Sequence, residues 1–181
     1  MSKPICTVMV GLPGTGKSTL VEKERAIYAG IDMPVFVYST DNLIEEWAAG
    51  QGWSYDFAFA KYIDRATSEM NRLLDEAIRE KRDIIWDQTN LGAKKRAKII
   101  NRMRQAGYQV RCVCIVPPEA GHISDLKDLK HRLANRPGKT IPPDLMSRMW
   151  ESYVLPTKDE GFDMITFYNM HGALIGIDLG V

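Results

Sequence analysis

Residues 11–18 read Gly-Leu-Pro-Gly-Thr-Gly-Lys-Ser, which fits the pattern G-x-x-x-x-G-K-[ST]. Such a loop curls its backbone N–H groups around phosphate oxygens, and a helix that begins near Lys17 adds the positive end of its dipole. We expect Lys17 to reach the β- and γ-phosphates of ATP and the Ser18 hydroxyl to ligate Mg²⁺. A glycine-rich turn with a chance lysine is the alternative, and the full match disfavours it. The predicted ATP contacts in this stretch are Gly11, Pro13, Gly14, Thr15, Gly16, Lys17, Ser18 and Thr19.

Two aspartates follow short apolar runs in which strands are expected. Asp41 comes after the run 35–38, and Asp87 ends the run 83–87. The carboxyl ends of parallel strands border one crevice, so both carboxylates should face the phosphate loop. Asp41 is then the candidate base that takes the proton of a hydroxyl acceptor, and Asp87 the candidate group that holds Mg²⁺ or orients the acceptor. The alternatives are a helix cap for Asp41 and a solvated turn residue for Asp87.

Phosphoryl transfer also requires cations over the transferring group. Arg132 and Arg136 are four residues apart, next to a Pro/Gly-punctuated loop that could close as a lid, and we predict that both contact the ATP phosphates. Arg136 is the predicted catalytic cation of the two. Four-residue spacing is equally typical of a solvated helix face, and the sequence leaves that alternative open.

Two further patterns bear on the acceptor. Between residues 94 and 111 the chain has seven basic residues and no acidic one, a stripe that either follows a nucleic-acid backbone or only solvates a helix. Trp47, Trp53, Tyr55 and Phe57 cluster around a glycine-containing loop between two expected helices. Stacking on an acceptor base is possible there, but packing of the loop onto the core is the simpler account.

The elements that must position these residues alternate between strand and helix. Apolar runs predict strands at 5–10, 35–38, 83–87, 110–116 and 162–167, and helical periodicity predicts helices at 17–29, 41–47, 55–81, 92–106, 122–135 and 144–153. This alternation predicts an α/β fold, a P-loop NTPase whose parallel sheet is flanked by helices on both faces. We expect an adenylate-kinase-like arrangement with a helical lid at about 122–153. The tail, 168–181, is either an edge strand or a docked extension.

Composition narrows the class of protein. The 181 residues suit a single domain, predicted as 1–181, and 24 basic against 23 acidic residues give no global positive field. The apolar run after Met1 is too short for a signal peptide or a membrane span, so we expect a cytoplasmic protein without membrane contact. Cys6, Cys112 and Cys114 all fall in strand-like runs and are expected to be reduced, buried thiols.

With these residues in view, the chain resembles the kinase domain of polynucleotide 5′-hydroxyl kinases, such as that of the bacteriophage and animal polynucleotide kinase-phosphatases. The resemblance spans most of residues 4–167 and is carried by four stretches, GLPGTGKST, STDN, DQTNLGAKKR and HRLANRPGKTIPPDLMSRMWESY. It implies that Asp41 is the general base for the acceptor 5′-OH and Arg136 the lid arginine on the donor phosphates. The acceptor side is predicted to comprise Asp41, Asp87, Thr89, Asn90 and Arg96.

The chain departs from that family at two points. Ile44 stands where the phage enzyme has an arginine that binds the acceptor phosphate, and no D-x-D-G-T phosphatase motif is present. The leading hypothesis is therefore an ATP- and Mg²⁺-dependent kinase of a nucleic-acid hydroxyl, most specifically a 5′-OH end of DNA or RNA. The alternatives are a kinase of a hydroxymethylated DNA base, of a nucleoside or of a small hydroxyl compound, and a non-catalytic ATP-gated binding module. The sequence does not predict the oligomeric state.

Overall fold

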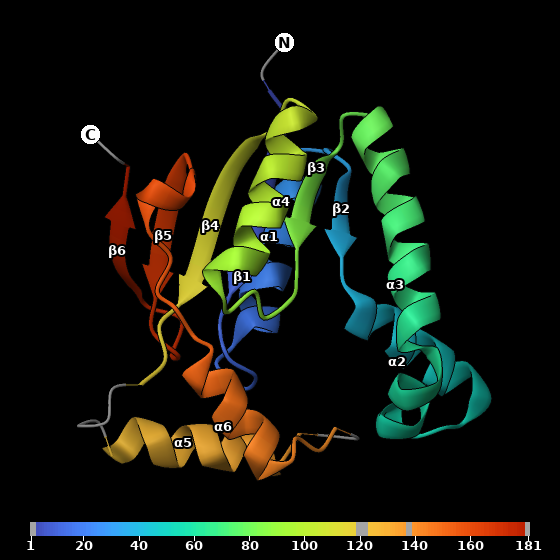
Figure 1. The fold of residues 1–181 in the computed structure, drawn as a ribbon, viewed down its shortest axis with the longest axis vertical. Helices are drawn as coiled ribbons and strands as arrows, with labels where there is room; N and C mark the ends of the chain where they lie inside the picture. Colours follow the sequence, from blue (N-terminus) through green and yellow to red (C-terminus); the bar gives the residue numbers. More distant parts are fainter. Residues whose placement is uncertain (1–2, 119–122, 137–138, 180–181) are drawn as a thin grey trace.

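A six-stranded sheet organises the chain (Figure 1). The computed structural model describes residues 3–118, 123–136 and 139–179. The strands are β1 (Ile5–Val10), β2 (Val35–Tyr38), β3 (Asp83–Trp86), β4 (Gln109–Ile115), β5 (Met164–Tyr168) and β6 (Leu174–Asp178). Their spatial order is β2-β3-β1-β4-β5-β6, and the first five are parallel. The predicted α/β fold with a mostly parallel sheet is confirmed, and the predicted strands all exist.

Helices cover both faces of the sheet, because the strands bury apolar side chains on both sides. On one face, Met70 and Leu74 of α3 (Tyr55–Arg79) and Ile99 and Met103 of α4 (Ala93–Gln105) pack on the sheet. On the other face, Leu20 and Val21 of α1 (Lys17–Gly30) pack on residues of β1, β3 and β4. Figure 1 shows α4 in front of the sheet and α1 behind it. The strand β1 is central and almost wholly buried, which fixes the position of the loop that follows it.

Two helices that follow β2 pack on each other. They are α2 (Thr40–Gln51) and α3, which pack on each other around Ile44, Ala48, Ala58 and Ala66. Serine side chains cap both helices: Ser39 Oγ accepts a hydrogen bond from the backbone N–H of Asn42 and Ser54 Oγ from that of Phe57, each at 3.3 Å. The first turn of each helix is therefore fixed locally.

The predicted lid consists of α5 (Ile123–Ala134) and α6 (Pro143–Glu151). In Figure 1 α5 runs across the edge of the sheet at which the parallel strands end. The buried Leu129 and the neighbouring Leu133 come to 3.1 Å from the position that a Cβ would take on Gly14. The start of the lid thus packs on the phosphate loop. Residues 122, 137 and 138 of the predicted lid lie outside the described residues.

The tail forms an edge strand. β6 pairs antiparallel with β5, so the first of the two alternatives for 168–181 is correct, residues 180 and 181 being outside the described part. The three cysteines are free and buried, as predicted. Among the described residues, no helix combines the length and apolar character that crossing a membrane requires.

Candidate functional site

The loop after β1 has the geometry of a phosphate cradle. Gly14 and Gly16 have φ values of 80° and 104°, which a side chain would strain, and α1 begins directly after Gly16. Lys17 folds back over the loop, where its Nζ donates hydrogen bonds to the carbonyl oxygens of Gly11 at 2.8 Å and Leu12 at 3.0 Å. The predicted strand, loop and helix are therefore present, with the backbone N–H groups of the loop at a helix N-terminus.

The charges of several predicted site residues act on the amine of Lys17. Desolvation lowers the pKa of Lys17 to about 8, and the Asp87 carboxylate is the largest influence opposing that shift. Asp41 also raises this pKa, whereas the positive charges of Arg136 and Lys139 lower it. Two of these residues follow strands and two come from the lid. Lys17, Asp41, Asp87 and Arg136 thus lie close enough for the charges of the other three to act on the Lys17 amine.

Asp41 lies in the first turn of α2 and its carboxylate is 52% exposed. Because Ser39 supplies the cap of this helix, the capping alternative for Asp41 is wrong. The Tyr55 hydroxyl donates a hydrogen bond to Asp41 Oδ1 at 2.8 Å, and Lys139 Nζ lies 3.5 Å from Oδ2. Sequence reasoning missed both contacts, because the partners are 14 and 98 positions away in the chain.

Asp87 and Ser18 have the chemistry that a Mg²⁺ site needs. Asp87 is half-buried just beyond β3, and burial raises the pKa of its carboxyl group while Lys17 opposes the shift. Ser18 presents an exposed hydroxyl on the first turn of α1. No group of three or more His, Cys, Asp or Glu side chains within the described ranges could hold a metal. Mg²⁺ accepts few protein ligands and completes its shell with water and phosphate oxygens, so a hydroxyl and one carboxylate fit it.

Thr89 and Asn90 of the predicted D-x-T-N stretch both make contacts to β1 and the phosphate loop. The backbone N–H of Gly11 donates to the Thr89 carbonyl oxygen at 3.1 Å, and Asn90 Nδ2 donates to the Met9 carbonyl oxygen at 2.8 Å. Asn90 is fully buried and has φ of 47°, a left-handed conformation that asparagine tolerates. The prediction that the Asn90 side chain contacts the acceptor is therefore wrong. Its amide braces the strand that carries the phosphate loop.

Arg96 was also predicted to bind the acceptor, and the structure corrects this. Its guanidinium is fully buried and donates to Glu160 through Nε at 2.7 Å and Nη2 at 2.6 Å. A further nitrogen donates to the carbonyl oxygens of Asn90 at 3.1 Å and Leu91 at 2.7 Å. With its donors occupied and no exposed surface, Arg96 joins α4 to the 3₁₀ turn η1 (Lys158–Glu160).

The two lid arginines differ in what they contact. The positive charge of Arg136 lowers the pKa of Lys17, so the two cations lie near each other. Arg132 instead donates to the Met170 carbonyl oxygen at 2.8 Å and pairs with Asp128 at 2.8 Å. Both partners hold the guanidinium on the wall of a cavity that Thr15 and Gly16 of the phosphate loop also line.

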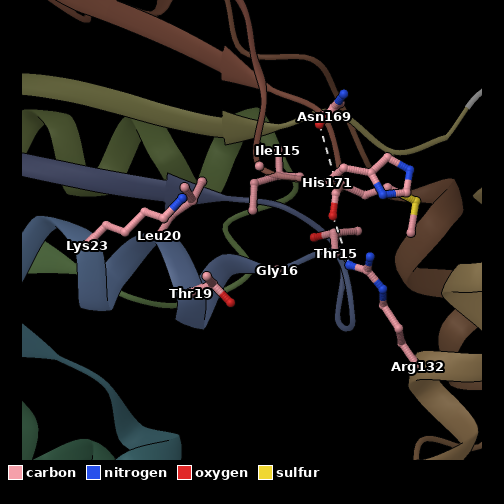
Figure 2. Close-up of a pocket in the computed structure, with 11 residues that line it drawn as sticks. Thr15, Gly16, Thr19, Leu20, Lys23, Ile115, Arg132, Asn169 and His171 are labelled. Atoms are coloured by element: carbon pink, nitrogen blue, oxygen red, sulfur yellow. Dashed lines mark hydrogen bonds between the residues drawn. The ribbon is translucent and has the colours of Figure 1, made fainter.

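A cavity of about 270 Å³ lies next to the phosphate loop (Figure 2). Its walls include Gly16 and Thr19 from the loop and helix, Arg132 from the lid, and the turn between β5 and β6. That turn contributes Asn169 and His171, and His171 Nε2 lies 3.3 Å from Asp125. No sequence motif predicted that Asn169 and His171 would line this cavity. They do so because they lie in the turn that joins β5 to the antiparallel strand β6.

Three of the seven basic residues of the stripe are engaged in ion pairs within the chain. Besides Arg96, Arg102 pairs with Asp75 at 2.7 Å and Arg104 with Asp163 at 2.9 Å. Lys94, Lys95 and Lys98 remain exposed. Partial desolvation lowers the pKa of Lys95 and the Asp41 carboxylate opposes the shift, so the charges of Lys95 and Asp41 act on each other.

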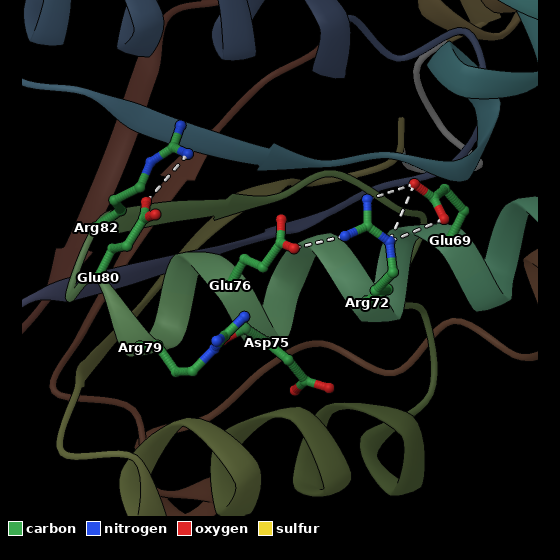
Figure 3. A network of polar contacts seen from close by, with 7 residues as sticks. All are labelled: Glu69, Arg72, Asp75, Glu76, Arg79, Glu80 and Arg82. Atoms are coloured by element: carbon green, nitrogen blue, oxygen red, sulfur yellow. Dashed lines mark hydrogen bonds and ion pairs between the residues drawn. The ribbon is translucent and has the colours of Figure 1, made fainter.

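The polar face of α3 shows the same internal pairing. Figure 3 shows Arg72 between Glu69 and Glu76, and Arg82 beside Glu80. The ion pairs of Arg72 measure 2.7 Å to Glu69 and 2.5 Å to Glu76. These exposed pairs solvate the helix. The aromatic residues between α2 and α3 mostly pack: Trp53 stacks on Tyr62 at 5.8 Å, and both border the Ile44 cluster. Packing is thus the correct account for that loop, with Phe57 the exposed member at 53%.

Comparison with known proteins agrees with this architecture. A model of the family AAA_33, described as an AAA domain, matches residues 7–152. A chain from the PezAT chromosomal toxin-antitoxin system of the human pathogen Streptococcus pneumoniae superposes with a TM-score of 0.63 at 16% sequence identity, covering 98% of this chain and 72% of that one. A candidate kinase from Chloroflexus aurantiacus superposes with a TM-score of 0.61 at 15% identity, covering 93% and 89%. At these identities the two structures show the fold alone.

Proposed function

The chain belongs to the AAA_33 family, a P-loop kinase-like family, and from that premise we propose that it transfers the γ-phosphoryl group of ATP to a hydroxyl acceptor. The observation that carries the proposal is the convergence on Lys17 of two carboxylates, Asp41 and Asp87, and of the lid cation Arg136. A phosphate-binding loop needs the lysine alone. A carboxylate within reach of the same phosphates is what activation of an acceptor requires.

On the donor side, the loop N–H groups and the Lys17 ammonium hold the β- and γ-phosphates. Ser18 and Asp87 would hold Mg²⁺, which would supply positive charge to offset the negative charge of the phosphates. Arg136 approaches from the lid and stabilises the equatorial oxygens of the transferring group. The cavity lined by Thr19, Arg132 and His171 opens beside the loop, where the nucleoside of ATP would lie.

On the acceptor side, Asp41 accepts the proton of the acceptor hydroxyl while the oxygen of that hydroxyl attacks the γ-phosphorus. The bond from the γ-phosphorus to the bridging oxygen breaks, and that oxygen leaves with the electron pair as part of ADP. The phosphoryl group and the proton are thus both accounted for, and no covalent enzyme intermediate is needed. In-line transfer of this kind depends on positioning and charge, which the cleft supplies.

For the acceptor itself, we propose a hydroxyl of nucleic acid, with the 5′-OH end of DNA or RNA as the first candidate. The D-x-T-N stretch and the lid sequence support it by their resemblance to polynucleotide kinases. Lys95, exposed near Asp41, has the charge to meet a phosphate next to the reacting hydroxyl. A hydroxymethylated base in DNA also has its hydroxyl near backbone phosphates, so it would use the same residues.

A second candidate, a nucleoside or another small hydroxyl compound, is favoured by different observations. Ile44 is fully buried, so the position at which the phage enzyme carries its acceptor arginine offers no contact. Three arginines of the basic stripe are engaged within the chain. Both observations reduce the charge available for a polyanion, and neither affects the chemistry of transfer.

The test is transfer of label from γ-labelled ATP with Mg²⁺ to a panel of acceptors, comprising 5′-OH DNA and RNA oligonucleotides, hydroxymethylated duplex DNA and free nucleosides. Label on 5′ ends that disappears in Asp41→Ala supports the polynucleotide acceptor. Label confined to the modified base or to nucleosides keeps the mechanism and replaces the substrate. A wild-type chain that binds ATP and labels nothing would instead support an ATP-gated binding module.

A further inference from the structure

The Asp41 carboxylate is held by groups from outside its own helix. It lies in the first turn of α2, and Ser39 already caps that helix. An exposed aspartate in a first turn has several rotamers open to it, and only some would point an oxygen at an acceptor hydroxyl. A general base must lie within hydrogen-bond reach of the proton that it removes. Something other than α2 must therefore fix the side chain.

Tyr55 supplies that restraint. It is the first residue of α3, where the capped Ser54 turn fixes its backbone, and its hydroxyl donates to Asp41 Oδ1 at 2.8 Å. The ring is half-buried and packs at 5.8 Å from Phe59. Burial and the neighbouring Asp41 charge raise the pKa of Tyr55 far above its usual value, so the hydroxyl keeps its proton and remains a donor.

Lys139 lies next to the other oxygen of the Asp41 carboxylate, Oδ2. Its ammonium lies 4.2 Å from the centre of the Tyr55 ring and 3.5 Å from Asp41 Oδ2, and it also pairs with Glu45. The two oxygens of Asp41 thus have different partners. Oδ1 accepts a directional hydrogen bond from a half-buried tyrosine, whereas Oδ2 faces the ammonium of Lys139, whose side chain is 14% exposed.

We propose that Tyr55 is a positioning residue for phosphoryl transfer, whose hydroxyl fixes Oδ1 of Asp41 so that Oδ2 is presented to the acceptor hydroxyl. The proposal rests on the proposed role of Asp41 as general base. The proton of the acceptor passes to Oδ2, and Tyr55 keeps its own proton throughout. Lys139 occupies the place near Oδ2 that the acceptor hydroxyl takes, and the acceptor displaces it.

The test is Tyr55→Phe, which removes the hydroxyl and keeps the ring under Lys139. A hydrogen bond to a charged group is worth enough that its loss should lower kcat about tenfold or more. The KM for ATP and the melting temperature should not change, since neither the phosphate loop nor the packing is altered. Tyr62→Phe is the matched control, because Tyr62 lies on the same helix, stacks on Trp53 and makes no hydroxyl contact to Asp41. It should leave kcat unchanged.

The coupling to Asp41 separates positioning from a general structural effect. In an Asp41→Asn background, Tyr55→Phe should cause no further loss of turnover, because the group that it positions no longer acts as a base. The probe is a 5′-OH DNA oligonucleotide, with hydrolysis of labelled ATP by water as the second readout. Equal additional losses in the wild-type and Asp41→Asn backgrounds would overturn the proposal, as would a raised KM for ATP or a lowered melting temperature in Tyr55→Phe.

Failure of this proposal is distinguishable from failure of the proposed function. If Asp41→Asn abolishes transfer and Tyr55→Phe retains wild-type kcat, Asp41 is the base and Tyr55 does not position it. If Asp41→Asn retains wild-type turnover, the base assignment itself is wrong and the role of Tyr55 falls with it. A wild-type chain that labels no acceptor of the panel and does not hydrolyse ATP would overturn both.

Discussion

The chemistry of each candidate site residue depends on the charges and hydrogen-bond partners around it as well as on its own type. Lys17, Asp41, Asp87 and Arg136 were predicted from sequence, and the structure surrounds Lys17 with the charges of the other three. The same Lys17 amine is bound by two loop carbonyl oxygens. It is therefore both the cation for the phosphates and the group most sensitive to its surroundings, which leads to two predictions.

Replacing Lys17 by alanine should lower phosphoryl transfer by roughly 10²–10³-fold, the usual effect of deleting one preorganised cation or donor at the reacting group. No other side chain of the loop can neutralise the β- and γ-phosphates. Single-turnover transfer of labelled phosphate measures the loss. Arg25→Ala, an exposed cation further along α1, is the control and should retain turnover within about twofold, a bound we set from the small effects of surface substitutions. Near-normal transfer in Lys17→Ala would exclude the P-loop mechanism.

The affinity for ATP should fall as the pH rises above about 8. Desolvation lowers the pKa of Lys17 to about 8, so the amine is protonated below that pH and increasingly neutral above it. Bound phosphates favour the protonated form, and each pH unit between the free and bound pKa values weakens binding by up to about tenfold. Calorimetric titration with ATP from pH 7 to 9.5 measures this. In Lys17→Met the dependence should be absent, and an unchanged dependence there would assign it to another group.

At the scale of elements, the sequence predicted order and type better than contacts. The phosphate-loop motif located β1 and α1, and the alternation of apolar runs located the other parallel strands. The sequence did not predict that the side chains of Arg96 and Asn90 are buried. A motif gives the identity and spacing of residues but not the direction of their side chains. The partner of Arg96 is Glu160, 64 positions away. The position of the β5–β6 turn beside the phosphate loop was likewise not predicted, because it depends on the antiparallel pairing of the tail strand β6 with β5.

The contact between Arg96 and Glu160 should be a main source of stability for the junction of α4 and η1. Removing one member of a buried ion pair strands the other, so Arg96→Ala should lower the free energy of unfolding by about 3–5 kcal/mol. Arg104→Ala breaks a pair whose arginine is 45% exposed and should cost less than about 1 kcal/mol. Urea unfolding followed by circular dichroism compares them. Similar costs for the two variants would contradict the structural role of Arg96.

The tip of the phosphate loop should not tolerate a side chain. Gly14 has φ of 80°, and a Cβ there would lie 3.1 Å from atoms of Leu129 and Leu133. The left-handed conformation costs a non-glycine residue about 1–2 kcal/mol, so Gly14→Ala should lower both stability and ATP affinity. Gly50→Ala in α2 meets nothing within 4 Å and should stabilise by about 0.5–1 kcal/mol. Thermal unfolding with and without ATP tests both, and a Gly14→Ala variant as stable as wild type would contradict the packing of α5 on the loop.

For the whole molecule, charge is the property that separates the candidate acceptors. The formal net charge is +1, and Arg96, Arg102 and Arg104 are paired within the chain. A polyanionic acceptor must then be held by a few local cations, of which Lys94, Lys95 and Lys98 are exposed on one helix. The field of the molecule contributes little at a distance, because opposite charges nearly cancel.

The salt dependence of the acceptor KM should therefore be modest for an oligonucleotide and absent for a nucleoside. Each phosphate neutralised by the protein adds close to one unit to the slope of log affinity against log salt, so we expect a slope of about −1 to −3 for a 5′-OH oligonucleotide. Lys95→Ala should make this slope shallower by about one unit, whereas Lys130→Ala on the exposed side of α5 should leave it unchanged. Transfer rates measured from 50 to 300 mM NaCl at fixed ATP and Mg²⁺ provide the slope. If the KM for every labelled acceptor is independent of salt, no phosphate of the acceptor is held by a cation, and the small hydroxyl compound replaces the polynucleotide as the proposed substrate.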